Sequence, residues 1–348
     1  MLRIGVIGCG KITQVRHAPE YAENANCTLV AWYDALPERA QAMADKFGGT
    51  VCRSVEEVLS LKPDAVSVCV ANRDHASVTI RALETGCHVL CEKPMAVTME
   101  ECERMLAAAK RTGKGLMLGH NQRFNKSHME ARRMLLSGEL GKPLAFRTSF
   151  AHPGPEGWTG QKNSWFIQKS QSAFGVLADL GIHKTDLIHY LLDEPIVSVT
   201  AMLGTVDKTY PDGGLIDVDD NALCLYRTRS GVMGQMHVSW TNYGAEDNAT
   251  RIYTTKGLLR LYDDPACSLI FESRDGGVQR LTIDEMTTNQ KQTAGQRQNT
   301  GVIDAFVESI LTGKPSIADA AECIKAMRVI FAAVQSAEEG VTVSVQHE

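Results

Sequence analysis

The first 120 residues alternate between two sequence patterns, and this alternation restricts the possible fold more than any other feature. Continuous apolar runs typical of buried strands occupy residues 3–7, 28–33, 65–70, 88–91 and 116–119. Amphipathic helical patterns lie between these runs, at residues 12–23, 37–47, 75–84 and 99–111. Apolar strands that alternate with helices form a parallel sheet covered on both faces. We therefore expect an N-terminal, doubly wound α/β domain, which binds its ligands at the carboxyl ends of its strands.

The pattern changes after about residue 123, where strands separated by short turns become dominant. The expected strands are 144–150, 197–203, 222–227, 232–240, 252–255, 258–262 and 268–272. The expected helices are 126–136, 174–192, 302–311 and 318–336. Such a series predicts a mostly antiparallel sheet with one face free for packing. Because 348 residues are too many for one ordinary core, we expect two domains, 1–122 and 123–348.

Composition excludes several classes of protein. The net charge is −5 and lysine and arginine form no block, so we expect no nucleic-acid partner. No apolar stretch approaches the roughly 20 residues that span a bilayer, and glycine interrupts the short apolar run at the N-terminus, so we expect neither a membrane segment nor a signal peptide. The ten cysteines form no CxxC pair, which favours reduced, buried thiols in the cytoplasm. Cys87 and Cys91 flank His88 without a second pair nearby, so we expect no metal.

The sequence GCGKIT, which begins at Gly8, follows the first expected strand and opens the first expected helix. In that context a GxGxx[G/A] pattern is typical of dinucleotide binding. Gly8 allows a tight turn and Gly10 lets a pyrophosphate approach the backbone. Lys11 and Ile12 begin a helix whose N–H groups attract phosphate. Thr13 replaces the usual third glycine or alanine, so a branched side chain must fit between helix and strand. An ordinary turn between a strand and a helix is the alternative.

Asp34 ends the second expected strand, 24 positions after Gly10. A carboxylate at this position accepts hydrogen bonds from both ribose hydroxyls of the adenosine half and repels a 2′-phosphate. No arginine follows at once, since Arg39 stands a helical turn away. We therefore expect NAD rather than NADP as the cofactor. The alternative for Asp34 alone is a cap on the next helix.

Residues that are mostly polar follow two further apolar runs. Ala71, Asn72 and His75 follow one run, and Glu92 with Lys93 follow the next. Because the carboxyl ends of parallel strands share one edge of the sheet, we expect these residues to reach the bound dinucleotide.

Glu92, Lys93 and Pro94 stand together where a buried strand ends. An ammonium beside an apolar sheet is costly unless it is paired or used. Pro94 fixes φ and removes an N–H donor, so the chain leaves the sheet there and Lys93 points into the crevice. Beside a nicotinamide, Lys93 can hydrogen-bond the substrate oxygen whose carbon exchanges hydride. A surface ion pair in a loop is the alternative.

The sequence FGVLADLGIHKTDLIHYLL is apolar nearly all round, which predicts a buried helix. Four polar residues fall within roughly 60° of one another on it at ~100° per residue, namely Asp179, His183, Asp186 and Tyr190. Asp179 and His183 are one turn apart, so the carboxylate can orient the imidazole. Such a pair suits a general base or acid near neutral pH. A satisfied core histidine and a metal site are the alternatives.

These segments together resemble the glucose–fructose oxidoreductase, inositol dehydrogenase and rhizopine-catabolism family, written Gfo/Idh/MocA. The resemblance spans nearly the whole chain and rests on GVIGCGKIT, Asp34, ANRDHASVTIRALETGCHVLCEKPMAVT, GHNQRFN and DLGIHKTDLIHYL. It implies a Rossmann domain followed by a C-terminal α/β domain with a large, open, mostly antiparallel sheet. That second domain binds the substrate and often forms oligomer contacts. The resemblance also implies a reaction on a carbinol of a sugar, a sugar derivative or a cyclitol.

The resemblance assigns roles to individual residues. Lys93 matches the motif lysine, and Asp179 with His183 matches the Asp-x3-His pair, with His183 as the residue that transfers the proton. Arg123 matches a substrate-contacting position of the inositol branch. The residues at positions that usually line the nicotinamide end are Asn72, His75, Glu92 and Asn121.

Aromatic residues of the second domain complete the expected site. Trp165 matches the tryptophan of a Trp-Arg pair that contacts the cofactor, with Phe166 in place of the arginine. We expect ring contacts with a sugar from His152, Trp158, Trp165 and Tyr243.

The sequence thus predicts an NAD(H)-dependent sugar or cyclitol dehydrogenase that forms a homo-oligomer, a dimer or tetramer, through its C-terminal sheet. Lys93 holds the hydroxyl oxygen, and His183, oriented by Asp179, takes its proton. Hydride passes from the same carbon to the nicotinamide. Two alternatives remain open. One is a glycoside-cleaving enzyme on the same fold that uses NAD transiently, and the other is a non-catalytic sensor that binds a dinucleotide.

Overall fold

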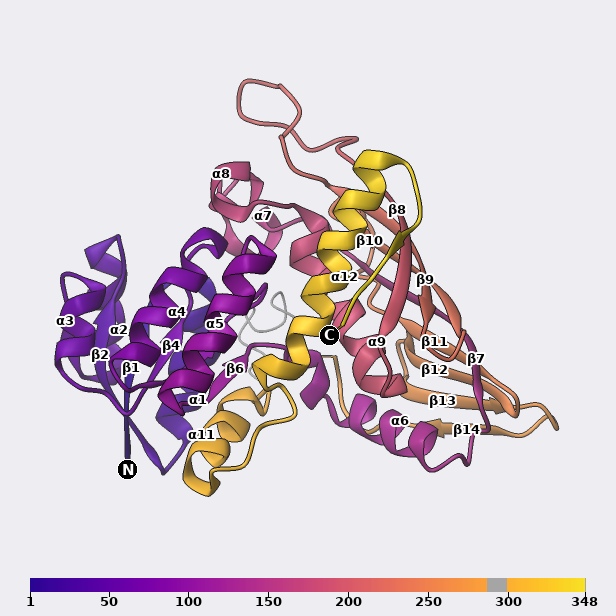
Figure 1. Cartoon of the computed structure of the whole chain (residues 1–348), viewed down its shortest axis with the longest axis horizontal. Coiled ribbons are helices and arrows are strands. Elements are labelled where there is room, and N and C mark those ends of the chain that lie inside the picture. The colour runs from indigo at the N-terminus through magenta and orange to yellow at the C-terminus, as the bar shows by residue number, and fades with distance from the viewer. Residues whose placement is uncertain (287–298, 348) are drawn as a thin grey trace. The chain divides into compact units, whose positions relative to one another are not determined.

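Six strands form the first sheet, in the order β3-β2-β1-β4-β5-β6 (Figure 1). The structure is a computed structural model and describes residues 1–286 and 299–347. The strands are β1 (Leu2–Ile7), β2 (Cys27–Tyr33), β3 (Thr50–Val51), β4 (Ala65–Val68), β5 (His88–Cys91) and β6 (Leu116–Leu118). Every neighbouring pair is parallel, so the carboxyl ends of the strands share one edge. This confirms the doubly wound sheet, and adds the short strand β3 to the five expected strands.

Several helices of this part pack on strands of the sheet. The helices of this part are η1 (Thr13–His17, π-helical), α1 (Ala18–Glu23), α2 (Pro37–Phe47), α3 (Val55–Ser60), η2 (Asn72–Asp74), α4 (His75–Glu84), α5 (Met99–Thr112) and α11 (Val302–Thr312). The sequence did not predict α3, which Ser54 caps by accepting a hydrogen bond from the N–H of Glu57 at 3.2 Å. The last helix, α11, comes from far along the chain and lies beside α1 (Figure 1). Asn24, at the end of α1, donates there to Asp304 at 2.7 Å.

Nine strands form the second sheet, in the order β14-β13-β12-β11-β7-β10-β9-β8-β15. They are β7 (Pro143–Ala151), β8 (Ile196–Gly204), β9 (Asn221–Thr228), β10 (Met233–Ser239), β11 (Thr250–Thr254), β12 (Gly257–Asp264), β13 (Cys267–Ser273), β14 (Val278–Leu281) and β15 (Val343–Ser344). Only the pairing of β7 with β10 is parallel among these described strands. The mostly antiparallel sheet is therefore confirmed, with β14 and β15 in addition to the seven expected strands.

The helices associated with the second sheet are η3 (Asn121–Phe124), α6 (Lys126–Leu136), α7 (Glu156–Thr159), η4 (Trp165–Ile167), α8 (Lys169–Ser172), η5 (Leu177–Gly181, π-helical), α9 (Ile182–Leu192) and α12 (Ala320–Glu339). Helix α9 packs on β7, while α6 packs on α9, β12 and β13. The residues of α9 from Ile182 to Leu191 are all buried, as the apolar character of this segment predicts.

The described chain forms two compact units, 1–121 with 299–324, and 122–286 with 325–347. The predicted domains, 1–122 and 123–348, assign residues 299–324 differently and stay a prediction. Among the described residues, none of the helices combines the length and the apolar content that crossing a bilayer requires.

Candidate active site

The loop between β1 and the helix that follows can only be built with glycine at its first position. Gly8 has a φ of +96°, and a Cβ on it would lie 2.3 Å from the carbonyl oxygen of Cys69. The N–H of Gly8 donates to Tyr33 at 2.7 Å, which fixes the start of the turn. Thr13 is buried, and its hydroxyl donates to the carbonyl of Gly8 at 2.6 Å. The branched side chain is thus accommodated as a hydrogen-bonding partner of the loop.

The other side of this loop is open. A Cβ on Gly10 would meet no atom within 4 Å, and a helix begins at Lys11 and continues through Ile12. The first N–H groups of a helix lack acceptors within the helix and attract phosphate. The open backbone of Gly10 beside these N–H groups therefore fits the pyrophosphate of a dinucleotide.

Five loops that carry expected cofactor residues follow strands of this sheet. They start after β1, β2, β4, β5 and β6, and the residues concerned are Gly8, Gly10, Lys11, Ile12, Asp34, Ala71, Asn72, His75, Glu92, Lys93 and Asn121. Since the strands are parallel, the structure places all of these loops at the same edge of the first sheet. Whether these residues bind the cofactor stays a prediction.

His75 is buried at the start of α4 and faces two carbonyl oxygens. Its Nδ1 lies 2.7 Å from Pro94 O, and its Nε2 lies 3.2 Å from Val70 O. Burial lowers the pKa of His75, although both carbonyls oppose this effect. The imidazole thus connects the loop after β4 to the chain just after Lys93, whose bond to Pro94 is cis.

In the second unit, the helix at 176–192 carries the predicted polar stripe. Asp179 and His183 are both buried. The indole N–H of Trp240 donates to Oδ2 of Asp179 at 3.1 Å, which fixes this carboxylate. The sequence did not identify Trp240, which directly follows β10 and is fully buried. The pairing of Asp179 with His183 stays a prediction.

Asp186, further along the polar stripe toward the C-terminus of the helix, forms an ion pair. Arg123 donates from Nε and Nη2 to the two carboxylate oxygens of Asp186, both at 2.7 Å, and both residues are buried. The guanidinium carbon also lies 5.5 Å from the centre of the Tyr190 ring. The ion pair uses two of the five N–H donors of Arg123. A substrate contact by Arg123 stays a prediction, and in this unit two of its N–H groups bind a side chain of α9.

Phe150 brings two of the expected site residues together. Its ring centre lies 6.0 Å from that of His183 and 5.7 Å from that of His152. The N–H of Gly154 donates to Nδ1 of His152 at 2.9 Å, so a neutral His152 carries its proton on Nε2. Lys184 lies under the same ring, with Nζ 5.8 Å from its centre.

Lys184 itself is completely buried, which the sequence did not predict. Its Nζ donates to Asn248 O at 3.0 Å and lies 3.4 Å from the hydroxyl of Thr250. Burial lowers the pKa of Lys184 to about 7, although Asp247 and Glu246 oppose the shift. A lysine inside a helix that is expected to be buried was the signal in the sequence that could have marked this position.

The remaining expected residues lie between strands of the second sheet, Trp158 in α7, Trp165 in η4 and Tyr243 in a loop. Trp165 stacks on Phe166 with ring centres 4.0 Å apart, and Trp158, which is buried, meets Phe166 edge to face at 5.6 Å. The residue that stands in place of the expected arginine therefore joins the two tryptophans in one aromatic cluster. Tyr243 is exposed and donates its hydroxyl hydrogen bond to Asp207, which raises the pKa of Tyr243 to about 12.

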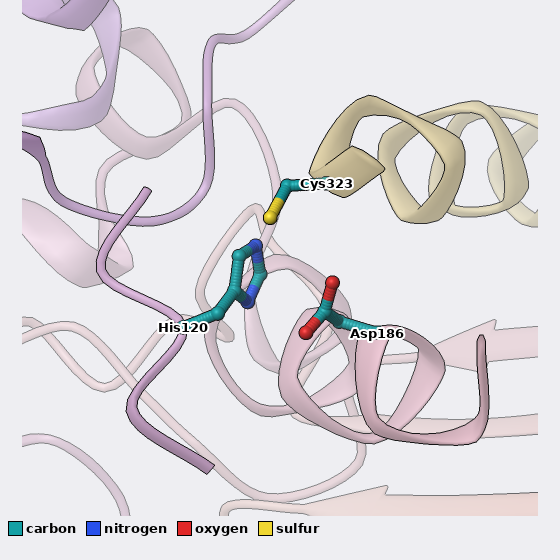
Figure 2. Close-up of side chains that lie close together, drawn as sticks. All are labelled: His120, Asp186 and Cys323. Atoms are coloured by element: carbon teal, nitrogen blue, oxygen red, sulfur yellow. The ribbon is translucent and has the colours of Figure 1, made fainter. Parts of the chain in front are cut away.

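His120 and Cys323 form a buried pair in the first unit, and Figure 2 shows the thiol directed toward the imidazole. Their possible ligand atoms lie within 4.8 Å of one another. Asp186, drawn in the same view, belongs to the second unit, where it binds Arg123. A structural zinc site needs four ligands, so we assign no metal to His120 and Cys323.

Comparisons with known proteins place this geometry in a family. Residues 2–120 match the model described as "Oxidoreductase family, NAD-binding Rossmann fold", and residues 128–260 match the Gfo/Idh/MocA C-terminal domain. The D-glucoside 3-dehydrogenase of Escherichia coli K12 is 30% identical, over 99% of this chain and 97% of its own. The inositol 2-dehydrogenase of Rhizobium meliloti is 27% identical, over 99% of both chains. The crystal structure of an aldose-aldose oxidoreductase from Caulobacter crescentus, complexed with glycerol, is 27% identical over 99% of both chains, with a TM-score of 0.82. The chain therefore belongs to the Gfo/Idh/MocA family of oxidoreductases.

Proposed function

We propose that this protein is a dehydrogenase that transfers a hydride between nicotinamide and a hydroxyl-bearing carbon of a sugar, a sugar derivative or a cyclitol. The observation that carries the proposal is the similarity, over 99% of the chain, to both a D-glucoside 3-dehydrogenase and an inositol 2-dehydrogenase. Glucosides and inositols share a six-membered ring with several hydroxyl groups, and this is the substrate class that we assign.

The residues at the edge of the first sheet fit a dinucleotide. The tight turn at Gly8 and the open backbone at Gly10 suit its pyrophosphate, and the carboxylate of Asp34 suits its adenosine ribose. When bound, the nicotinamide supplies the chemistry of hydride transfer. We assign NAD rather than NADP, because a carboxylate at Asp34 repels a 2′-phosphate.

We assign the proton chemistry to three residues of this chain. His183 takes the proton of the reacting hydroxyl group, and Asp179 orients its imidazole. Lys93 hydrogen-bonds the oxygen of that hydroxyl group. The hydrogen bond from Trp240 supports this assignment, because it holds the carboxylate of Asp179 in one orientation.

Ring contacts with the substrate are assigned to aromatic residues of the second unit. Faces of aromatic rings suit the C–H patches of a sugar, and the candidates are His152, Trp158, Trp165 and Tyr243. Among these, His152 has the strongest support, since Phe150 holds it near His183.

We also propose a homo-oligomer formed through the second sheet. Met202, Leu223, Leu225 and Met233 are each more than half exposed, and the pairing of β8, β9 and β10 puts them on one face. An apolar patch of this kind favours association with another protein surface. The ten free cysteines favour the reducing cytoplasm as the location.

A panel of substrates tests the function. The purified protein is incubated with NAD and, separately, with free sugars, alkyl glucosides and inositols, while NADH absorbance and the products are followed. We expect steady formation of NADH with at least one of these ring compounds. Cleavage of a glucoside without net NADH would favour the glycoside-cleaving alternative. NAD binding without turnover of any compound would favour the sensor and contradict the proposal.

A further inference from the structure

A chain of polar contacts runs through the interior of the first unit to the end of β5. The hydroxyl of Tyr21 lies 2.9 Å from Oγ of Ser67, which lies 3.1 Å from Nδ1 of His17. Nε2 of His17 lies 2.9 Å from Oε1 of Glu92. The first three residues are buried, and the side chain of Glu92 is 13% exposed. Buried polar groups of this kind are normally paired, and here each finds its partner in the next.

The contact between His17 and Glu92 joins two opposite charges. Burial alone would raise the pKa of Glu92, but the hydrogen bond and the charge of His17, aided by Lys93 and Arg16, lower it to about 2. Burial alone would lower the pKa of His17, but the Cys69 sulfur and the Glu92 carboxylate raise it to about 10. Both shifts favour the charged forms of the pair, an imidazolium and a carboxylate.

Another charged group beside His17 is Glu20, one turn further along the helix. Its carboxylate accepts hydrogen bonds from the N–H and the hydroxyl of Thr300, at 3.0 and 2.9 Å. Burial raises the pKa of Glu20, against these hydrogen bonds and the charge of His17. Thr300 holds Glu20, and the carboxylate that pairs with His17 is that of Glu92, with Nε2 and Oε1 2.9 Å apart.

The second carboxylate oxygen of Glu92 binds the backbone of Lys93. Oε2 accepts a hydrogen bond from the backbone N–H of Lys93 at 3.2 Å. The main chain of Glu92 is fixed as well, because its N–H donates to Val68 O at 3.0 Å. Gly119 leaves just enough room for the carboxylate, since a Cβ there would lie 2.9 Å from its atoms. The carboxylate is thus held by His17 on one side and holds the backbone of Lys93 on the other.

We propose that His17 is a positioning residue for hydride transfer, which fixes the Glu92 carboxylate through its Nε2 contact and, through that carboxylate, the backbone of Lys93. This inference rests on the proposed function, in which Lys93 binds the substrate oxygen. His17 touches neither that oxygen nor its proton, so its effect on the reaction passes through Glu92.

The charge state of His17 can be measured without any substrate. The full-length protein is labelled with ¹³C at the histidine rings, and the resonances are followed by NMR from pH 5 to about pH 9. The resonance missing from His17→Gln is the one assigned to His17. We expect it to stay at the imidazolium position over this range. A His17 resonance that titrates near its ordinary pKa of about 6.5 would overturn the proposal, whether or not the protein is a dehydrogenase.

The pH dependence of kcat/KM separates positioning from a structural role. In His17→Gln the carboxylate loses its nearest cation, so burial raises the pKa of Glu92 and activity should fall at low pH with a new ionisation. In the double variant with Glu92→Gln this ionisation should be absent. Misplacement of Lys93 should lower kcat by up to about 10²-fold with little change in NAD affinity. A His17→Gln protein with a lower Tm and the wild-type pH profile would contradict the proposal.

Two further variants provide matched comparisons. Gly119→Ala changes no charge but displaces the carboxylate from its place between His17 and the backbone of Lys93, so it should lower kcat in the same way as His17→Gln. Tyr21→Phe removes only the hydroxyl that contacts Ser67, at the other end of the chain of contacts, and should keep the wild-type pH profile. Equal effects of Tyr21→Phe and His17→Gln on the pH profile would show that the Glu92 contact is not the cause, and would overturn the proposal.

Discussion

The backbone N–H of Cys9 donates a hydrogen bond to Asp34, with 2.7 Å between the nitrogen and Oδ2. Oδ1 of the same carboxylate accepts from the N–H of Leu36 at 2.8 Å, just before α2 begins. The side chain is thus fixed between the phosphate loop and the turn at Leu36. It does not cap α2, because no side chain accepts a hydrogen bond in the first turn of that helix, so the alternative role of Asp34 as a helix cap is wrong. Each oxygen keeps a lone pair for a further hydrogen bond.

This fixed carboxylate should select the cofactor. We expect NAD to bind at least tenfold more tightly than NADP, a difference of ~1.4 kcal/mol. Asp34→Ala should reduce this preference, while Asp45→Ala, which changes a carboxylate on α2 that is bound to Gln41, should not. Fluorescence or calorimetric titration with both cofactors measures the ratio, and equal affinities for the wild-type protein would remove Asp34 from cofactor selection.

Lys93 should act in the reaction rather than in cofactor binding. It stands directly after β5, at the edge of the sheet where the dinucleotide loops lie. We expect Lys93→Ala to lower kcat strongly and to leave the Kd of NAD nearly unchanged. Lys110→Ala, on the exposed side of α5, is the control. Steady-state kinetics with wild-type turnover would exclude Lys93 from the mechanism, and loss of NAD binding would make it a cofactor residue.

Lys184 should make the stability of the protein depend on pH. Because burial lowers its pKa to about 7, against an unfolded value of about 10.4, the unfolded chain binds one more proton between these two pH values. The free energy of unfolding should therefore rise with pH in this window, relative to Lys184→Met, by up to ~1.4 kcal/mol per pH unit. Below pH 7 the folded and the unfolded state both bind the proton. The difference in the free energy of unfolding between the wild-type protein and Lys184→Met should then be constant.

Urea unfolding of both proteins at several pH values from 7 to 10 measures this difference. Lys110→Met, an exposed lysine, should give a curve parallel to that of the wild-type protein. If the free energy of unfolding of Lys184→Met also changed with pH in parallel with that of the wild-type protein, Lys184 would keep its ordinary proton affinity in the folded state.

The ion pair of Arg123 and Asp186 should be important for stability. Removing one partner of a buried, bidentate pair leaves an uncompensated charge, so Asp186→Ala should lower the free energy of unfolding by ~3–5 kcal/mol. Arg133→Ala removes an exposed arginine that pairs with Glu130 and Glu139, and should change little. Denaturant unfolding compares the two variants. A small loss for Asp186→Ala would mean that water or another group replaces the carboxylate.

The sequence predicted those parts of the fold that depend on local patterns. The apolar run that became β1 and the nearly apolar segment that became α9 carry their own signals, because burial on both faces selects such sequences. By contrast, β3 and β15 have two residues each, and they are strands only because β2 and β8 lie beside them. No local pattern encodes such a partner.

The site shows the same division. The sequence placed Asp186 in the polar stripe of a buried helix, but its partner Arg123 stands 63 positions away in the sequence. Trp240 is 61 positions from Asp179, and Glu92 is 75 positions from His17. These pairs form because strands and helices that are distant in the sequence pack together. Only the tertiary structure determines which two residues meet. The sequence could therefore single out Asp179, Asp186 and Glu92, but it could not pair them with Trp240, Arg123 and His17.

The role of His183 as proton acceptor is tested most directly by measuring the pH dependence of kcat/KM together with the Tm of His183→Gln. In the wild-type protein, kcat/KM for oxidation should fall at low pH with one dominant ionisation, because an imidazolium cannot accept the proton. In His183→Gln we expect a folded protein with a Tm near that of the wild type, turnover reduced ~10²–10⁴-fold and no such ionisation. A variant with a lowered Tm but nearly normal turnover would show instead that His183 is a core residue, and would contradict the proposed mechanism.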